Sequence, residues 1–187
     1  MNPLLIEVPE ALETERLLIA SPRPGIGPLM SLAVAETIGQ LSPWMAWAQQ
    51  VPGIEEAEAV VRQQMADFIL RKDLPYQIYD KAKEGRRLLG GTGLHRMDWE
   101  LRSFEIGYWI RASAQGQGYV TEAVLALTKM AFEQLRARRV EIRMDDVNVK
   151  SRAVAERCGF ELEGILRQDS LSPSGVPRNT CVYARIA

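Results

Sequence analysis

The segment FEIGYWIRASAQGQGYVTEAV, Phe104 to Val124, changes from one hydrophobic period to another within a few residues. Its first part alternates, which predicts a half-buried strand over Ser103 to Arg111. One face of that strand carries Phe104, Ile106, Tyr108 and Ile110, and the other carries Glu105, Gly107 and Trp109. Its last part predicts a long helix with a core-facing stripe at steps of three and four, made of Val120, Val124, Leu127, Ala131 and Leu135.

A short glycine loop, Gln115-Gly116-Gln117-Gly118, joins the strand to the helix. A helix N-terminus presents unpaired backbone N–H groups and about half a positive charge, so it can bind phosphate oxygens without basic side chains. Glycine allows the backbone to approach an anion closely. A plain strand-to-helix turn, with glycines chosen for geometry, is the alternative interpretation, and the pattern alone leaves both open.

The flanking sequence predicts a mixed α+β domain. The order of expected elements is β-α-α-β-β-β-α-β-α-β-β, which alternates too irregularly for a doubly wound fold. Expected strands lie at 15–21, 76–80, 87–95, 139–145, 160–166 and 179–186, and expected helices at 27–38, 55–69 and from Asn148 to Gly159. A turn is expected at Lys83 to Arg86, centred on Gly85.

Length and composition indicate one domain, 1–187, of an ordinary globular class. A net charge of −1 provides no global field to hold nucleic acid, so no nucleic-acid partner is expected. One histidine and two cysteines exclude the usual metal clusters, and Cys158 and Cys181 are expected to be free thiols. No metal is therefore expected.

The N-terminal residues lack the basic region of a signal peptide. The longest uncharged stretch, Thr37 to Ile54, contains two prolines and several polar residues and therefore does not predict a bilayer-spanning helix. We expect a cytoplasmic protein without a membrane partner.

Two common phosphate motifs fit this loop poorly. A Walker A loop needs Lys-Ser/Thr after its last glycine, and neither residue type follows Gly118. The dinucleotide fingerprint needs a third glycine and a βαβ context, and both are missing.

Four segments in order resemble the Gcn5-related N-acetyltransferases (GNAT), and within them the RimJ/RimL type that acetylates ribosomal-protein N-termini. FEIGYWI with QGQGYVTEAV is similar to the coenzyme-binding strand and loop of that family. The other similar segments are ETERLLIA near the start, SPWMAW at Ser42 to Trp47, and DDVNVKSRAVAERCGFELEGILR at Asp145 to Arg167. The resemblance implies a largely antiparallel sheet of six to seven strands, helices on both faces, and a splayed strand pair that holds the coenzyme.

The resemblance implies acetyl-CoA as co-substrate. Its pyrophosphate would lie on the backbone N–H groups of Gln115, Gly116, Gln117, Gly118, Tyr119 and Val120, and its pantetheine arm would pair with the strand around Trp109 and Ile110. Gln115 and Gly118 fit the family pattern Q/R-x-x-G-x-G/A. Val120 departs from that pattern because a small residue is usual there, and its bulk would crowd the pyrophosphate.

Transfer of acetyl to an amine needs a proton acceptor, oxyanion donors and an acid for the leaving thiolate. The resemblance implies Glu105 as general base, Ser151 as that acid and Asn148 as a pantetheine contact. The structural alternatives are an ion pair between Glu105 and Arg143, and an N-cap role for Asn148 with Ser151 in the first turn. His95 is a second candidate base.

Trp44 and Trp47 lie in a loop and would either wall the acceptor pocket or close the core or a dimer contact. No activated cysteine is evident, so direct transfer to a primary amine is expected. The acceptor would be the α-amino group of a protein or peptide N-terminus. The alternatives are a small amine (a polyamine or an antibiotic) and a non-catalytic CoA-binding module. Relatives are often dimers, and both a homodimer and a monomer fit this sequence.

Overall fold

The segment Phe104 to Val124 forms a strand and a helix in a computed structural model that describes residues 2–82 and 87–187. The strand is β5, Ser103–Ile110, and the helix is α3, Tyr119–Glu133, as the change of hydrophobic period predicts. A single 3-10 turn, Ala112–Ala114, precedes the glycine loop between them. Phe104 and Ile106 on one strand face and Val124 and Leu127 on the helix are buried in the same core cluster.

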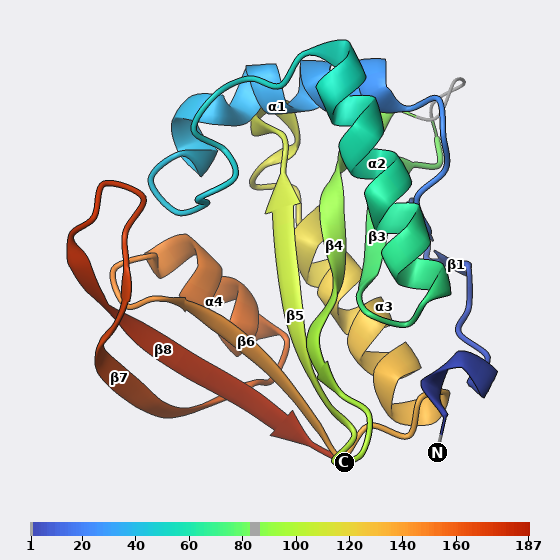
Figure 1. The fold of residues 1–187 in the computed structure, drawn as a ribbon. Helices are drawn as coiled ribbons and strands as arrows, with labels where there is room; N and C mark the ends of the chain where they lie inside the picture. The colour runs from blue at the N-terminus through green and yellow to red at the C-terminus, as the bar shows by residue number, and fades with distance from the viewer. Residues whose placement is uncertain (1, 83–86) are drawn as a thin grey trace.

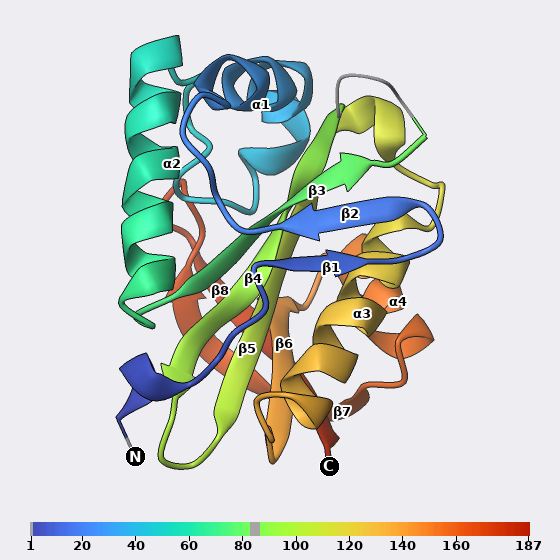
Figure 2. The same ribbon diagram turned by 90° about the vertical axis from the view of Figure 1, so that its right-hand side faces the viewer.

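The strands of the described residues all join one eight-stranded sheet in the order β1-β2-β3-β4-β5-β6-β8-β7 (Figures 1 and 2). Every neighbouring pair is antiparallel except β5 and β6, which are parallel. The remaining strands are β1 (Ala11–Glu13), β2 (Leu17–Ala20), β3 (Leu74–Asp80), β4 (Leu88–Asp98), β6 (Arg139–Asp145), β7 (Glu161–Leu171) and β8 (Pro177–Ile186).

Helices cover both faces of the sheet, as expected (Figure 2). The helices α1 (Gly27–Leu41) and α2 (Ile54–Ile69) lie on one face, and α3 and α4 (Val149–Arg157) lie on the other. Asn148 caps α4, since its side chain accepts a hydrogen bond from the Ser151 amide at 3.1 Å. No helix in the part of the chain that the structure describes is long and apolar enough to cross a membrane.

The sheet has one or two more strands than the six to seven expected. The unexpected strand is β1, which pairs with β2 from Ala11↔Ala20 to Glu13↔Leu18. Three residues with mostly exposed side chains are too few to show an alternating pattern, so β1 exists through its pairing with β2 rather than through a local signal. The turn expected at Lys83 to Arg86, centred on Gly85, lies outside the described residues.

Candidate active site

The sheet opens between β5 and β6 (Figure 1). These strands pair only from Ser103↔Arg139 to Glu105↔Glu141 and then diverge. Alternate residues of a strand direct their backbone polar groups to opposite neighbours. The Arg111 amide donates to the Leu89 carbonyl of β4 at 2.7 Å. The backbone groups of Trp109, two residues earlier, therefore also face β4, whereas those of Tyr108 and Ile110 face the opening. The opening can therefore pair with an extended ligand.

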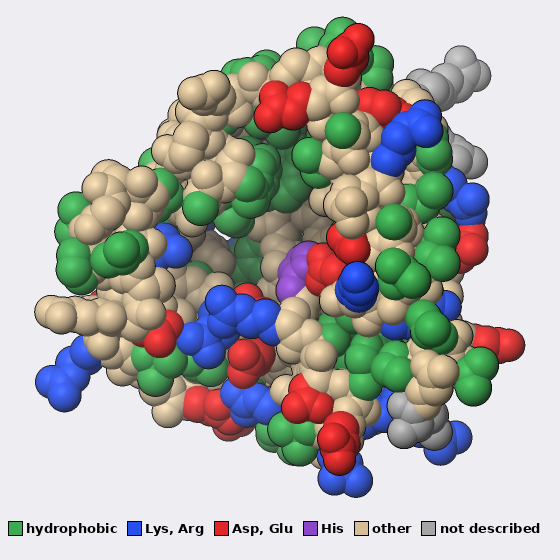
Figure 3. Space-filling model, in the orientation of Figure 1, with side chains coloured by type: hydrophobic (Ala, Val, Ile, Leu, Met, Phe, Trp, Pro, Cys, Tyr) green, Lys and Arg blue, Asp and Glu red, His purple; other side chains and the backbone are tan. Residues whose placement is uncertain are grey.

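A cavity of about 260 Å³ lies where the two strands part. Its walls come from β5, β6, the start of α4, the β7–β8 hairpin and the loop after α1. Figure 3 shows this face hollowed, with acidic and basic side chains together at the edge. The lining includes Glu105 and Ser151, together with Asn148, Tyr108, Gly107, Trp44, Met45, Arg96, Arg143, Asp145, Asp169 and Arg178.

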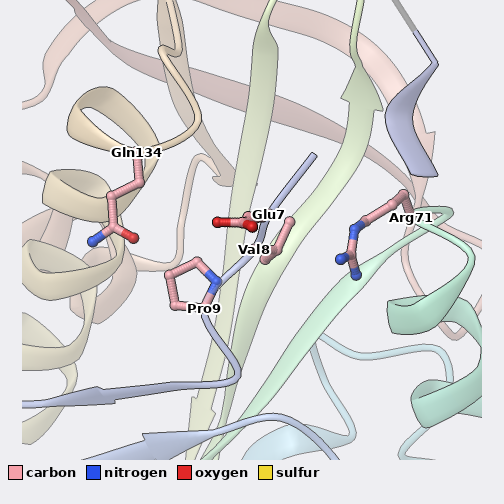
Figure 4. Close-up of a pocket in the computed structure, with 5 residues that line it drawn as sticks. All are labelled: Glu7, Val8, Pro9, Arg71 and Gln134. Atoms are coloured by element: carbon pink, nitrogen blue, oxygen red, sulfur yellow. The ribbon is translucent and has the colours of Figure 1, made fainter. Parts of the chain in front are cut away.

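A second hollow, of about 550 Å³, lies near the N-terminus and is lined by Glu7, Val8, Pro9, Arg71 and Gln134 (Figure 4). Its one basic side chain, Arg71, already donates hydrogen bonds to the carbonyl oxygens of Ile6 and Phe68. None of the residues singled out in the sequence lines it. Despite its greater volume, we therefore place the site at the opening of the sheet.

The glycine loop leaves a row of backbone amides unpaired. In the described part of the chain, no acceptor receives a hydrogen bond from the amides of Gly116, Gln117, Gly118, Tyr119 or Val120. Gly118 is the N-cap of α3 and has φ +80°, a left-handed conformation that side chains with a Cβ adopt at a cost. The amide of Gln115 differs, because it bonds to the Ala112 carbonyl at 3.2 Å.

Arg16 holds this loop in place from the side. Its guanidinium donates to the Gln117 carbonyl at 2.9 Å and lies 4.6 Å from the centre of the Tyr119 ring. It also pairs with Glu122 in the first turn of α3 at 2.6 Å. Val120 packs against the core cluster while staying partly exposed, so the crowding of a pyrophosphate by its side chain stays a prediction.

Glu105 lines the cavity at the last paired position of β5 and β6. Its side chain is 17% exposed, and its Oε2 atom is buried without a hydrogen-bond partner among the described residues. Burial raises the pKa of the Glu105 carboxyl, while Arg96, whose Nε lies 3.4 Å from Oε2, opposes the rise. A carboxylate whose pKa is raised, and whose Oε2 accepts no hydrogen bond from the described residues, is a better proton acceptor than an exposed glutamate.

The ion pair between Glu105 and Arg143, the structural alternative to a general base, does not form. Arg143 instead pairs with Asp169 at 2.9 Å, and Arg96 on β4 lies beside Glu105. Arg96 follows His95 on the adjacent strand β4, and His95 lies directly opposite Glu105. Arg143 lies beyond the last paired position of β5 and β6.

Ser151 lines the same cavity from the first turn of α4. Its Oγ atom lies 2.8 Å from the Tyr108 hydroxyl, which also donates to the Ser151 carbonyl at 3.2 Å. Burial raises the pKa of Tyr108 to about 12, so its phenol remains protonated at neutral pH. This link across the opening was missed in the sequence, where Tyr108 is indistinguishable from the core residues that share its strand face.

Trp44 lines the cavity, whereas Trp47 is 55% exposed and packs edge-on against Trp109, with ring centres 6.0 Å apart. Trp109 also packs against the core between the sheet and α1 and α2. The two loop tryptophans therefore lie on the face of the opening covered by α1 and α2, near the cavity but in different surroundings.

Neither cysteine is placed for nucleophilic attack. Cys158 and Cys181 are both buried free thiols, and burial raises the pKa of Cys158 to about 11. A thiol with so high a pKa provides almost no thiolate at neutral pH. Among residues 2–82 and 87–187, no group of three or more His, Cys, Asp or Glu side chains is placed to hold a metal ion.

A sheet opened between parallel strands, with unpaired helix amides at its edge, defines a protein that binds an extended, phosphate-bearing ligand. Residues 30–161, well over half of the chain, match the model of the acetyltransferase (GNAT) domain. The chain therefore belongs to the GNAT acetyltransferase family.

Relatives agree with this assignment. The chain is 42% identical over 97 residues to the "Putative ribosomal N-acetyltransferase YdaF" of Bacillus subtilis, a match that spans 52% of each protein, about half the length. Among solved structures, it resembles the microcin C7 self-immunity acetyltransferase MccE in complex with acetyl-CoA and AMP (TM-score 0.88, 26% identity, covering 96% of this chain and 98% of that one). It also resembles RimL, a ribosomal L7/L12 alpha-N-protein acetyltransferase, in complex with coenzyme A (TM-score 0.86, 25% identity, covering 95% and 98%).

Proposed function

We propose that this protein transfers acetyl from acetyl-CoA directly to the α-amino group of a protein or peptide N-terminus. In this proposal the amides of Gly116 to Val120, together with Gln115, hold the pyrophosphate, and the backbone groups at the open edge of β5, around Ile110, pair with the pantetheine arm. The observation that carries the proposal is the buried carboxylate of Glu105, which lies beside Arg96 but accepts no hydrogen bond at Oε2 from the described residues, at the point where the strands part.

The residues of the cavity have defined roles in the proposed reaction. Glu105 takes a proton from the acceptor ammonium, so that the neutral amine can attack the thioester carbonyl. Ser151 gives its proton to the departing thiolate, and the Tyr108 hydroxyl beside it supports that donation. Asn148 caps α4 and thereby positions Ser151, and its place in the cavity lining allows the pantetheine contact as well.

The charges of the cavity favour an acceptor with a single positive charge. Each acidic side chain in the lining has a basic neighbour: Asp169 lies 2.9 Å from Arg143, Asp145 lies 3.8 Å from Arg178, and Glu105 lies 3.4 Å from Arg96. A polyamine or an aminoglycoside needs several carboxylates that are not already paired. Acetylation of a small amine is the second candidate, because MccE, a self-immunity acetyltransferase solved with acetyl-CoA and AMP, is as similar in fold as RimL.

An acceptor screen tests the proposed function. We expect binding of acetyl-CoA by calorimetry and release of free thiol with peptides that carry a free N-terminus, but none with the same peptides blocked at that amine. Faster thiol release with spermidine or an aminoglycoside would assign the small-amine function instead. Binding of acetyl-CoA without thiol release across the whole panel would identify a non-catalytic module.

The double variant Trp44→Ala/Trp47→Ala tests the acceptor pocket. We expect it to lose discrimination between peptides that differ in their first side chains, because the aromatic walls beside the cavity are removed. The affinity for acetyl-CoA should stay unchanged, since neither ring belongs to the glycine loop. The measurement is kcat/KM for a set of N-terminal peptides, and an unchanged selectivity profile would refute the assignment of these two residues.

A further inference from the structure

His95 is held by a carboxylate that the proposed reaction does not otherwise use. Its Nδ1 atom lies 2.8 and 2.9 Å from the two oxygens of Asp73, which stands between α2 and β3. A carboxylate only accepts hydrogen bonds, so Nδ1 carries the hydrogen and Nε2 of the neutral ring keeps a free lone pair. Asp73 thus orients the ring and keeps Nε2 free to accept a proton.

The imidazole lies across Gly107 of β5, a residue that lines the cavity. A Cβ at Gly107 would stand 2.8 Å from Cδ2 and 3.0 Å from Nε2 of His95, so only glycine allows the ring to lie flat on β5 at that point. Gly107 and Glu105 both line the cavity. His95 is also directly opposite Glu105 in the register of β4 and β5, and opposite residues in a sheet project from the same face.

Exposure increases from the carboxylate to the imidazole. The Glu105 side chain is 17% exposed and its Oε2 atom is buried, whereas His95 is 35% and Asp73 is 34% exposed. Glu105 therefore lies deeper in the protein than the His95–Asp73 pair that shares its face of the sheet.

The chemistry requires a route for a proton from Glu105 to solvent, and this step rests on the proposed function. The ammonium first gives one proton to Glu105, and the amine then attacks the thioester carbon. When the carbon–sulfur bond breaks, the electron pair leaves with sulfur, which takes the proton of Ser151, and the nitrogen of the new amide returns a proton to Ser151. One proton per turnover remains on Glu105 and must reach solvent before the next cycle.

The geometry points to His95 and Asp73 as the exit for that proton. Glu105 passes the proton to Nε2 of His95, which Asp73 keeps available by holding the hydrogen on Nδ1, and the ring then releases a proton to solvent. His95 is the relay residue, and Asp73 is a positioning residue that acts through it.

His95→Ala in the full chain tests this relay, with an N-terminal peptide as acceptor. We expect kcat to fall about tenfold, less than the loss of a direct general base, with the KM for acetyl-CoA unchanged. Added imidazole should restore most of the lost kcat, since a small diffusible base can occupy the space of the missing ring. A purely structural role for His95 predicts no such rescue.

Asp73→Asn and Asp67→Asn form a matched pair. Asp67 lies near the end of α2, the helix that precedes Asp73, and its side chain bonds only to Gln63 among the described contacts, so Asp67→Asn should leave kcat at the wild-type value. Asp73→Asn should lower kcat but add nothing in the His95→Ala background. Thermal melting of each variant separates loss of fold from loss of relay.

The outcomes also separate the two proposals. If the wild-type protein releases thiol and His95→Ala does so at the same rate, or at a reduced rate that imidazole does not restore, the relay is refuted and the acetyltransferase proposal stands. If the wild-type protein releases no thiol with any acceptor, the proposed function itself fails.

Discussion

Glu105→Gln is expected to lower kcat by about 10²-fold or more, because direct general-base catalysis contributes about that factor. Burial raises the pKa of Glu105, so the wild-type rate should increase with pH as the carboxyl loses its proton, and the variant should lose that dependence. The KM for acetyl-CoA should stay unchanged, since the carboxylate lies away from the glycine loop. The measurement is the initial rate of thiol release at several pH values.

Glu141→Gln is the matched control for this variant. Glu141 is the parallel partner of Glu105 on β6, pairs with Arg139 at 2.8 Å and does not line the cavity. We expect this variant to retain turnover. Since the charge of Glu141 contributes to the raised pKa of Glu105, the rise of the reaction rate with pH should move to lower pH.

Stability measurements complete this test. Because the pKa of Glu105 is higher in the folded than in the unfolded state, ionisation of this carboxyl opposes folding. The protonated carboxyl contributes fully to stability below the unfolded-state pKa, and this contribution is lost as the pH rises through the folded-state pKa. Glu105→Gln should therefore not lower the melting temperature at neutral pH. Equal losses in kcat and in acetyl-CoA affinity, together with a lower melting temperature, would show that Glu105 is structural.

Gly118→Ala is expected to weaken acetyl-CoA binding by about 5- to 30-fold. An alanine at φ +80° costs about 1–2 kcal/mol, and every 1.4 kcal/mol is about tenfold in Kd. The free loop can relax to avoid this strain, whereas the phosphate-bound loop must keep its amides pointing at the ligand, so the cost falls on binding. The added Cβ itself has room, because its closest neighbour is Arg16 Nη2 at 3.4 Å.

Gly175→Ala provides the comparison for Gly118→Ala. Gly175 has φ +83° in the turn between β7 and β8, and no atom lies within 4 Å of an added Cβ. We expect Gly175→Ala to leave Kd unchanged, which calorimetry with acetyl-CoA measures, because any cost of the strained alanine falls on thermal stability and not on binding. Unchanged binding in Gly118→Ala would mean that the amides of the glycine loop are not the pyrophosphate site.

Local rules account for the parts of the fold that could be predicted. The change of period between Phe104 and Val124, the N-cap at Asn148 and the helix end at Gly159 each depend on contacts within one or two turns of chain. The strand β6 has the predicted bounds for the same reason, because its alternation matches its burial. The strand β1 was missed because it depends on β2 alone.

The candidate site likewise has a part that could be predicted from local sequence and a part that could not. The glycine loop and its unpaired amides follow from adjacent residues, so the sequence by itself determined the phosphate-ready end of α3 and the family resemblance that goes with it. Only the tertiary structure decided that Arg96 rather than Arg143 pairs with Glu105, that Tyr108 meets Ser151, and that Asp73 orients His95. Those partners are joined by strand register and helix packing over many intervening residues, and the free energy that selects them comes from burying the whole sheet rather than from any single segment.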